Sequence, residues 1–301
     1  MRHGICRALL RHAAAPDFLF LTGDLGFQAL EPLRDAAGAR FINAGVAEQN
    51  MVSVAAGAAR AGFKPWAYSI APFIYGRPFE QIRNDVCLHD LPVRLVGNGG
   101  GFAYGVMGPT HHALEDYGAL LCLPHIRVFI PAFADDVPSI VDQLMPDAHP
   151  AYVRLGRCEK PKDIPSPAYA PWRRLARGQG PALLAVGPLA GGLLAAVREL
   201  SEALRPNLWV LAELPIAAEA IPREFLEDMR GSGHLCVVEE HVAHAGVGES
   251  LARLLLLSGQ APARFTHRCA AGYLSGLYGS QEFHRRECGL DAGSILAGLR
   301  G

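Results

Sequence analysis

Glu48 is the carboxylate of this sequence that is best placed for acid–base chemistry. It follows the segment Asn43-Ala44-Gly45 and opens a stretch of helical periodicity, residues 48–60, that is rich in small side chains. A carboxylate in the first turn of a helix is common, because it complements the helix dipole. A carboxylate in a dry pocket can also share a proton with a ring nitrogen. Both interpretations begin at the same place, where a strand ends and a helix starts.

Two adjacent histidines, His111 and His112, follow the turn at residues 108–110. Neighbouring side chains point apart in helices and in strands, and no C-x-x-C or H-x-x-x-H spacing accompanies the pair, so a metal motif is not indicated. A histidine in a loop at the end of a strand is suited to donating a proton or binding a hydroxyl group. His111 is therefore a candidate for contact with substrate, and we expect no metal ligands in this chain.

The elements that must position these residues alternate along the first 155 residues. The segments that resemble strands are residues 18–21, 40–43, 93–97, 127–130 and 151–155. The segments with helical periodicity are residues 48–60, 79–88, 114–121 and 135–144. Such alternation predicts a parallel β-sheet with helices on both faces.

The composition changes after residue 160. Residues 160–181 contain five prolines and several charges. Because proline supplies no amide donor to a helix or sheet, this stretch predicts a linker. A second, smaller alternation of strands and helices follows. The predicted fold class is α/β, with two doubly wound domains at residues 1–160 and 182–301 and a linker at residues 161–181.

The overall composition excludes several classes of protein. The chain has 301 residues, half of them hydrophobic, and a net charge of -1, which argues against nucleic acid or an anionic membrane as partner. The N-terminus lacks the pattern of a signal peptide, and no apolar run approaches the roughly 20 residues of a membrane span. The seven cysteines are scattered and form no C-x-x-C pair, so we expect reduced thiols in a cytoplasmic protein.

The segment Phe41–Asn50, with the sequence FINAGVAEQN, resembles the pyrimidine-binding domain of the transketolase and deoxyxylulose-phosphate synthase family. It carries that family's G-[IV]-[AR]-E-[QF] signature. The resemblance implies thiamine diphosphate as cofactor, with Glu48 hydrogen-bonded to the pyrimidine nitrogen N1′ and so activating the cofactor. It also implies that Asp24 and Leu25 lie near the thiazolium ring and that Phe73 stacks on the pyrimidine.

Each of the last three residues also has a purely structural interpretation. Asp24 has the residue type of a turn or a helix cap. Leu25 is typical of a hydrophobic core, and aromatic residues such as Phe73 are more often core than cofactor contacts.

The tetrad Gly-Pro-Thr-His at residues 108–111 resembles the same family, whose histidine contacts substrate hydroxyls. The resemblance implies a catalytic and substrate-binding role for His111. Arg154 matches a phosphate-binding arginine of the family, and Arg2 is a weaker match to a second one.

Three positions depart from the family's pattern. Met107 stands where the family usually has an aspartate that contacts a sugar hydroxyl. Gly99 and Gln28 stand where transketolases have a phosphate-binding histidine and serine. The departures leave the catalytic core supported, but they do not support a standard sugar-phosphate substrate.

The family's diphosphate-binding domain, with a G-D-G motif and a later asparagine that hold Mg²⁺ and the diphosphate, is not matched in this sequence. We therefore expect a split enzyme, in which a separate diphosphate-binding N-terminal subunit supplies the Mg²⁺ ligands and two copies of each chain form an α2β2 assembly. The second half resembles the family's C-terminal domain at residues 237–241 and 289–291. We expect His241, within the first of these segments, to be structural.

The favoured function is transfer of a two-carbon ketol unit from a ketose donor to an aldehyde acceptor, both of them small molecules. One alternative is a β-type subunit of an oxo-acid dehydrogenase, which delivers acyl groups to a lipoyl or carrier domain. A second alternative is a catalytically silent scaffold subunit, against which the intact motif around Glu48 argues. The sequence leaves the donor, the acceptor and the pathway open.

Overall fold

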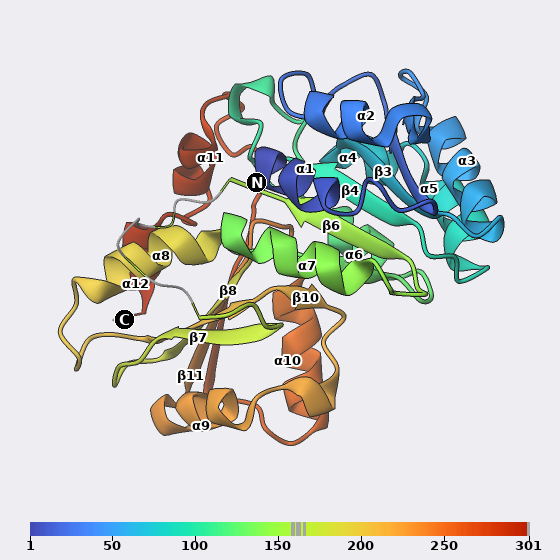
Figure 1. Ribbon diagram of the computed structural model, residues 1–301. Coiled ribbons are helices and arrows are strands. Elements are labelled where there is room, and N and C mark those ends of the chain that lie inside the picture. Colours follow the sequence, from blue (N-terminus) through green and yellow to red (C-terminus); the bar gives the residue numbers. More distant parts are fainter. Residues whose placement is uncertain (158–159, 161–163, 165–166, 300–301) are drawn as a thin grey trace.

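The computed structural model describes residues 1–157, 160, 164 and 167–299, which form two β-sheets flanked by helices (Figure 1). The larger sheet has the order β10-β5-β6-β4-β3-β1-β2, and all of its strands are parallel except β10. Its strands are β1 (Phe18–Thr22), β2 (Phe41–Asn43), β3 (Lys64–Ile70), β4 (Arg94–Asn98), β5 (Arg127–Phe129), β6 (Ala151–Leu155) and β10 (Glu213–Leu214).

Helices cover both faces of this sheet because successive strand residues point to opposite sides. Phe18 and Phe20 face one core, and Leu19 and Leu21 face the other. The first face is covered by α1 (Arg2–Leu10), α2 (Glu31–Ala37) and α7 (Val137–Leu144). The second is covered by α3 (Glu48–Arg60), α4 (Ala71–Gly76), the turn α5 (Phe79–Gln81) with the π-helix that continues it (Ile82–Cys87), and α6 (Asp116–Leu120).

The smaller sheet has the order β12-β11-β8-β9-β7, with β7 antiparallel at its edge. Its strands are β7 (Trp172–Ala176), β8 (Ala182–Val186), β9 (Asn207–Leu211), β11 (His234–Val238) and β12 (Arg264–Arg268). One face packs against α8 (Leu189–Arg198) and α12 (Ala292–Gly298), the other against α9 (Arg223–Ser232) and α10 (Val247–Leu257). The helix α11 (Gln281–Glu287) packs instead toward the short helix Gly105–Met107 of the first half.

The predicted α/β fold with two parallel sheets is confirmed, and three strands were missed. The central strand β3 was not predicted, and neither was the short β10. The predicted linker at residues 161–181 contains β7, so the linker prediction is wrong for residues 172–176. An edge strand tolerates nearby prolines because one side of its backbone needs no partner. Residues 161–163 and 165–166 of the predicted linker lie outside the described residues.

The two halves of the chain are connected by a strand and by a buried ion pair. β10, which follows β9 of the smaller sheet, pairs with β5 at the edge of the larger sheet. Arg173 on β7 and Asp136 at the start of α7 form a two-pronged ion pair, with Nη1–Oδ1 and Nη2–Oδ2 both 2.7 Å, and the two side chains are only 2% and 3% exposed. The halves are therefore joined by buried charge as well as by a strand.

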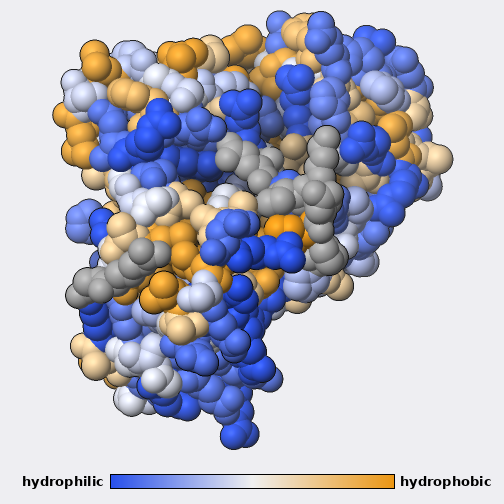
Figure 2. All heavy atoms as spheres, turned by 90° about the vertical axis from the view of Figure 1, so that its left-hand side faces the viewer, coloured by the Kyte–Doolittle hydropathy of each residue, from blue (hydrophilic) through white to orange (hydrophobic). Residues whose placement is uncertain are grey.

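The face that carries α8, α11 and α12 has hydrophobic and hydrophilic residues interspersed (Figure 2). Within the described part of the chain, every helix is too short or too polar to cross a membrane.

We predict that Arg173→Met lowers the free energy of unfolding by about 3–5 kcal/mol, because it leaves the buried Asp136 carboxylate without its cation. Urea denaturation measures the change. Arg223→Met is the control, since Arg223 pairs with Glu227 at the surface, where such a pair contributes about 0–1 kcal/mol. Equal losses in the two variants would contradict the role assigned to the buried pair.

Candidate active site

Glu48 begins α3, as predicted, at the end of the larger sheet where β1, β2 and the unpredicted β3 finish. Its side chain is 2% exposed. Ser69 on β3 donates a hydrogen bond to Oε1 at 3.1 Å, and Arg77 Nη1 donates to Oε2 at 2.8 Å. Each carboxylate oxygen therefore has a donor, as a buried charge requires.

Arg77 connects Glu48 to an aromatic ring. It directly follows α4, and its guanidinium carbon lies 3.9 Å from the ring centroid of Phe73. The Phe73 ring in turn meets the His111 ring edge to face, with centroids 5.2 Å apart. The structure thus brings three predicted residues, Glu48, Phe73 and His111, into one continuous group through Arg77.

The two adjacent histidines point to different surroundings. His111 Nδ1 lies 2.9 Å from Thr110 Oγ1, and the ring is half-buried near Phe73. His112 is buried, with Nδ1 2.8 Å from the Tyr273 hydroxyl and Nε2 2.9 Å from the carbonyl oxygen of Gly105. His112 is therefore a structural residue, and His111 alone faces the group around Phe73.

Asp24 and Leu25 lie on the loop after β1, beside this group. Asp24 and Asn43 form a reciprocal pair of hydrogen bonds, each 2.9 Å long, that joins the ends of β1 and β2. The backbone before this pair runs close to Glu48, since a Cβ at Gly23 would lie 3.5 Å from Glu48 Oε1. Leu25 packs against the core of the α1–α2 face and lines a cavity of about 250 Å³. Their roles toward the cofactor stay predictions.

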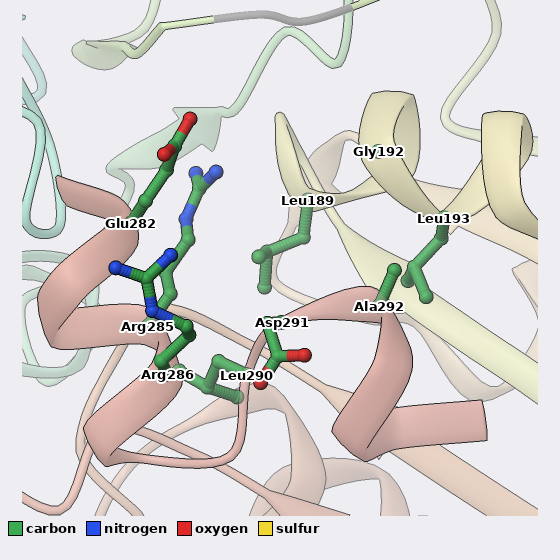
Figure 3. Close-up of a pocket in the computed structure, with 9 residues that line it drawn as sticks. All are labelled: Leu189, Gly192, Leu193, Glu282, Arg285, Arg286, Leu290, Asp291 and Ala292. Carbon is green, nitrogen blue, oxygen red and sulfur yellow. The ribbon is translucent and has the colours of Figure 1, made fainter. Parts of the chain in front are cut away.

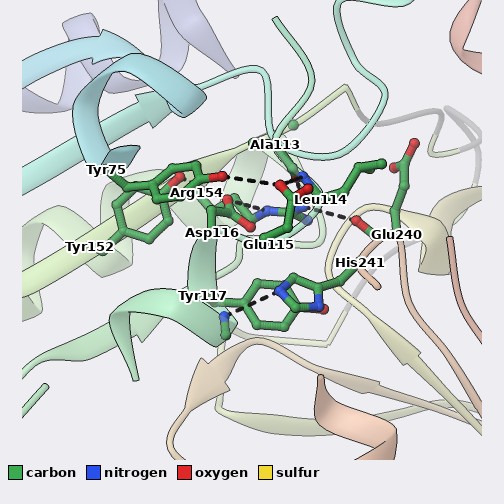
Figure 4. A network of polar contacts seen from close by, with 12 residues as sticks. Tyr75, Ala113, Leu114, Glu115, Asp116, Tyr117, Tyr152, Arg154, Glu240 and His241 are labelled. Atoms are coloured by element: carbon green, nitrogen blue, oxygen red, sulfur yellow. Dashed lines mark hydrogen bonds and ion pairs between the residues drawn. The ribbon is translucent and has the colours of Figure 1, made fainter. Parts of the chain in front are cut away.

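Arg154, predicted to bind a phosphate, lies in a network of polar contacts (Figure 4). It is 4% exposed, and its Nε lies 2.7 Å from Asp116 Oδ2. Its Nη2 donates to the carbonyl oxygens of Ala113 and Glu240 at 2.7 and 2.9 Å. Burial opposes the charged form, but the nearby Asp116 carboxylate outweighs it and the pKa of Arg154 is raised. In this position Arg154 ties the two halves together, and its predicted role toward a phosphate stays a prediction.

His241 belongs to the same network. Its ring stacks on Tyr117 with centroids 3.8 Å apart, and Nε2 accepts a hydrogen bond from the backbone N–H of Gly118 at 3.2 Å. Burial lowers the pKa of His241. These contacts fit the structural role predicted for it.

An open cavity of about 340 Å³ lies against Glu48 and is lined by Val46, Ala47, Gln49 and Arg77 as well. A second cavity, of about 280 Å³, lies between α8, α11 and α12 (Figure 3). Its polar lining includes Arg285, Arg286 and Asp291, and none of the predicted site residues lines it. The candidate site is therefore at Glu48.

Two residues of the site, Ser69 and Arg77, were missed in the sequence. Ser69 lies on β3, a strand that was not predicted, so nothing placed it beside Glu48. Arg77 stands four residues after Phe73, the spacing that puts side chains on one side of a helical turn. That spacing was the available signal for Arg77.

The residues present fit the pyrimidine end of thiamine diphosphate. The guanidinium of Arg77 is planar, stacks on Phe73 and donates a hydrogen bond to Glu48. A protonated aminopyrimidine ring is also planar and also carries N–H donors. Phe73 and Glu48 are thus spaced to hold a flat, nitrogen-bearing group, for which Arg77 stands in. The described residues contain no group of three or more His, Cys, Asp or Glu side chains that could hold a metal ion.

We predict that Arg77→Met lowers the free energy of unfolding by about 1 kcal/mol, because the buried Glu48 carboxylate loses a charged donor. The same substitution in a Glu48→Gln background should cost less than about half of that, since the carboxylate is already gone. Urea denaturation of the four proteins gives the coupling. Arg83→Met, at an exposed arginine on the next helical segment, is the control. An equal effect of Arg77→Met in both backgrounds would show that the two side chains are not coupled.

Comparisons with known proteins identify the family. Residues 12–161 match the family described as "Transketolase, pyrimidine binding domain". The chain is 30% identical to a subunit of the apulose-4-phosphate transketolase of Actinobacillus succinogenes, over 85% of this chain and 83% of that protein. It is 32% identical to 1-deoxy-D-xylulose-5-phosphate synthase of Thioalkalivibrio sulfidiphilus, over 87% of this chain but only 40% of that protein.

A solved structure shows the same arrangement over nearly the whole chain. The structure described as "Split gene transketolase, inactive beta4 tetramer" is 29% identical with a TM-score of 0.81, and the match covers 99% of this chain and 96% of that one. With the pyrimidine-binding match in the first half and the structural match continuing through the second, this chain belongs to the transketolase family of thiamine diphosphate-dependent enzymes, as a pyrimidine-binding domain followed by a C-terminal domain.

Proposed function

We propose that this chain is the pyrimidine-binding subunit of a split transketolase that moves a two-carbon ketol unit from a ketose to an aldehyde. The observation that carries the proposal is Glu48, a buried carboxylate whose two oxygens have donors and which is linked to Phe73 and His111. An acidic side chain held in this way can share a proton with a ring nitrogen. A scaffold subunit would have no need of a buried carboxylate that lines an open cavity, as Glu48 does.

The chain's own residues would have distinct tasks. When bound, thiamine diphosphate supplies a nucleophilic carbon that takes up the two-carbon unit. Glu48 would hold a proton at the pyrimidine nitrogen, and Phe73 would fix the plane of the ring. His111, with Nδ1 occupied by Thr110, would offer Nε2 to a substrate hydroxyl. Asp24 and Leu25 would lie beside the thiazolium end.

Arg77 must change its contacts when the pyrimidine ring binds. It now lies on Phe73 and on Oε2 of Glu48, the two groups that the ring would need. Its side chain is 43% exposed, so it has room to swing outward. The buried carboxylate would exchange one planar partner for another and would not be left without a donor.

A partner subunit would supply the diphosphate and Mg²⁺ ligands. The relative from Actinobacillus succinogenes is named as one subunit of its transketolase, and this chain covers 83% of it. The matching split transketolase is described as an inactive tetramer of β chains, and the match covers 96% of that chain. Both similarities support the proposal that this chain needs another polypeptide for activity. An α2β2 assembly and a cytoplasmic location stay predictions from the sequence.

Glu48→Gln should lower kcat of the assembled enzyme by at least about 100-fold while leaving the fold intact, because glutamine keeps the shape but cannot exchange the proton. The direct measurement is hydrogen–deuterium exchange at C2 of bound thiamine diphosphate. Circular dichroism and the urea midpoint control for folding. Exchange at the wild-type rate in Glu48→Gln would remove Glu48 from its assigned role.

We expect the isolated chain to bind thiamine diphosphate with a Kd weaker than micromolar in the presence of Mg²⁺, because only the pyrimidine end finds contacts. Activity should appear when the chain is mixed with a G-D-G-bearing partner, and the mass of the active complex should correspond to two copies of each. Calorimetry and mass photometry make the two measurements. Micromolar binding, which is about -8 kcal/mol, or turnover by this chain alone would refute the split assembly.

A further inference from the structure

Tyr104 occupies a space that opens because residue 99 has no side chain. Gly99 directly follows β4 and has a φ of +80°, a conformation that favours glycine. A Cβ at this position would lie 2.1 Å from Cε2 of Tyr104, so any side chain there would collide with the ring. Tyr104 can therefore occupy this position only because residue 99 is a glycine.

The Tyr104 hydroxyl has an unused donor. Asn98 Nδ2 donates to the phenolic oxygen at 2.8 Å, and no acceptor for the phenolic proton is present among the described residues. Burial raises the pKa of Tyr104 above its ordinary value, so the phenol is protonated at neutral pH. Arg2 is the cation whose charge acts on this group.

The ring of Tyr104 lies beside His111, with centroids 5.7 Å apart and the planes inclined by 54°. Thr110 occupies Nδ1 of His111, and Nε2 has no hydrogen-bond partner in the described part of the chain. On its other side His111 meets Phe73, which leads to Glu48. Two neighbouring rings, one carrying a phenol and one an imidazole nitrogen, thus each have hydrogen-bonding capacity to spare next to the candidate active site.

The nearby loop surface is uncharged. Val106 and Met107 directly precede the tetrad that carries His111, and they are 70% and 52% exposed. A loop of this kind offers hydrogen bonds and apolar contact, but no carboxylate and no cation at its tip.

We propose that Tyr104 is a specificity-determining residue, which donates a hydrogen bond to a substrate hydroxyl next to the one that His111 binds. The inference rests on the proposed function and adds the substrate class to it. Two neighbouring hydrogen-bonding groups match a vicinal diol, so this end of the site selects an uncharged, polyhydroxylated carbon chain beyond the transferred unit. A group built to bind a hydroxyl discriminates against a substrate that lacks it, because the half-buried phenol would then have no acceptor.

The test compares two donors in the assembled enzyme. Xylulose carries hydroxyls beyond its two-carbon unit, and hydroxypyruvate carries none. Tyr104→Phe should raise KM for xylulose about tenfold, the loss of about one hydrogen bond, and leave KM for hydroxypyruvate unchanged. Exchange at C2 of the cofactor should stay at the wild-type rate, because Tyr104 does not reach Glu48 or the pyrimidine.

Two further variants separate recognition from structure. Asn98→Ala removes the donor to Tyr104 but keeps the phenol, so it should raise KM for xylulose less than about threefold. An effect as large as that of Tyr104→Phe would mean that the Asn98–Tyr104 bond only supports the loop, and the proposal would be overturned. Tyr278→Phe, at an exposed phenol that packs near Gly108, should change neither KM.

The outcomes also distinguish this proposal from the proposed function. If the wild-type complex exchanges the C2 proton normally but Tyr104→Phe affects both donors equally or neither, the role of Tyr104 is wrong and the enzyme assignment stands. If the wild-type complex shows no exchange and no turnover with either donor, both proposals fall.

Discussion

The burial of one carboxylate, that of Glu48, constrains the arrangement of this half of the molecule. A charge that is 2% exposed needs donors on both oxygens, and these come from two separate elements, β3 and the end of α4. The backbone must also approach it closely, which it does at Gly23. Parallel strands bring all these pieces to one edge of the sheet, because their carboxyl ends meet there. The fold therefore supplies the donors without which a carboxylate buried at this point would destabilise the protein.

The two sides of Glu48 have different partners for a physical reason. Ser69 is neutral and lies on a strand that is paired on both sides, so the sheet fixes the position of its backbone. Arg77 is charged, half-exposed and placed after a short helix, so its contact can be exchanged. Before a ligand binds, the buried carboxylate needs donors on both of its oxygens. When the ligand arrives, one of these donors must give up its place. A rigid Ser69 and a replaceable Arg77 meet both requirements.

Sequence reasoning reached the residues that lie in motifs and missed those that lie between them. Glu48 and His111 were found because neighbouring residues form recognisable patterns at the ends of predicted elements. β3 was missed although it is central, and its second residue, Pro65, weakens the strand signal. Ser69 was lost with it. Arg154 was assigned by pattern to a phosphate, but a partner 38 residues away, Asp116, determines its environment, and no local signal reveals such a pair.

The C-terminal half supports the loop that carries His111. Glu240 accepts a hydrogen bond from the backbone N–H of Phe102 at 3.1 Å, and Tyr273 bonds His112 at 2.8 Å. The backbone of the C-terminal half packs closely against Gly105, since a Cβ at this position would lie 3.2 Å from the carbonyl oxygen of Gly279. The loop between β4 and α6 is thus anchored at its beginning, middle and end by residues of the other half. Because His111 lies next to the last of these anchors, its position depends on the contact between the halves. The second half of the chain thus helps to position His111, although all the predicted site residues lie in the first half.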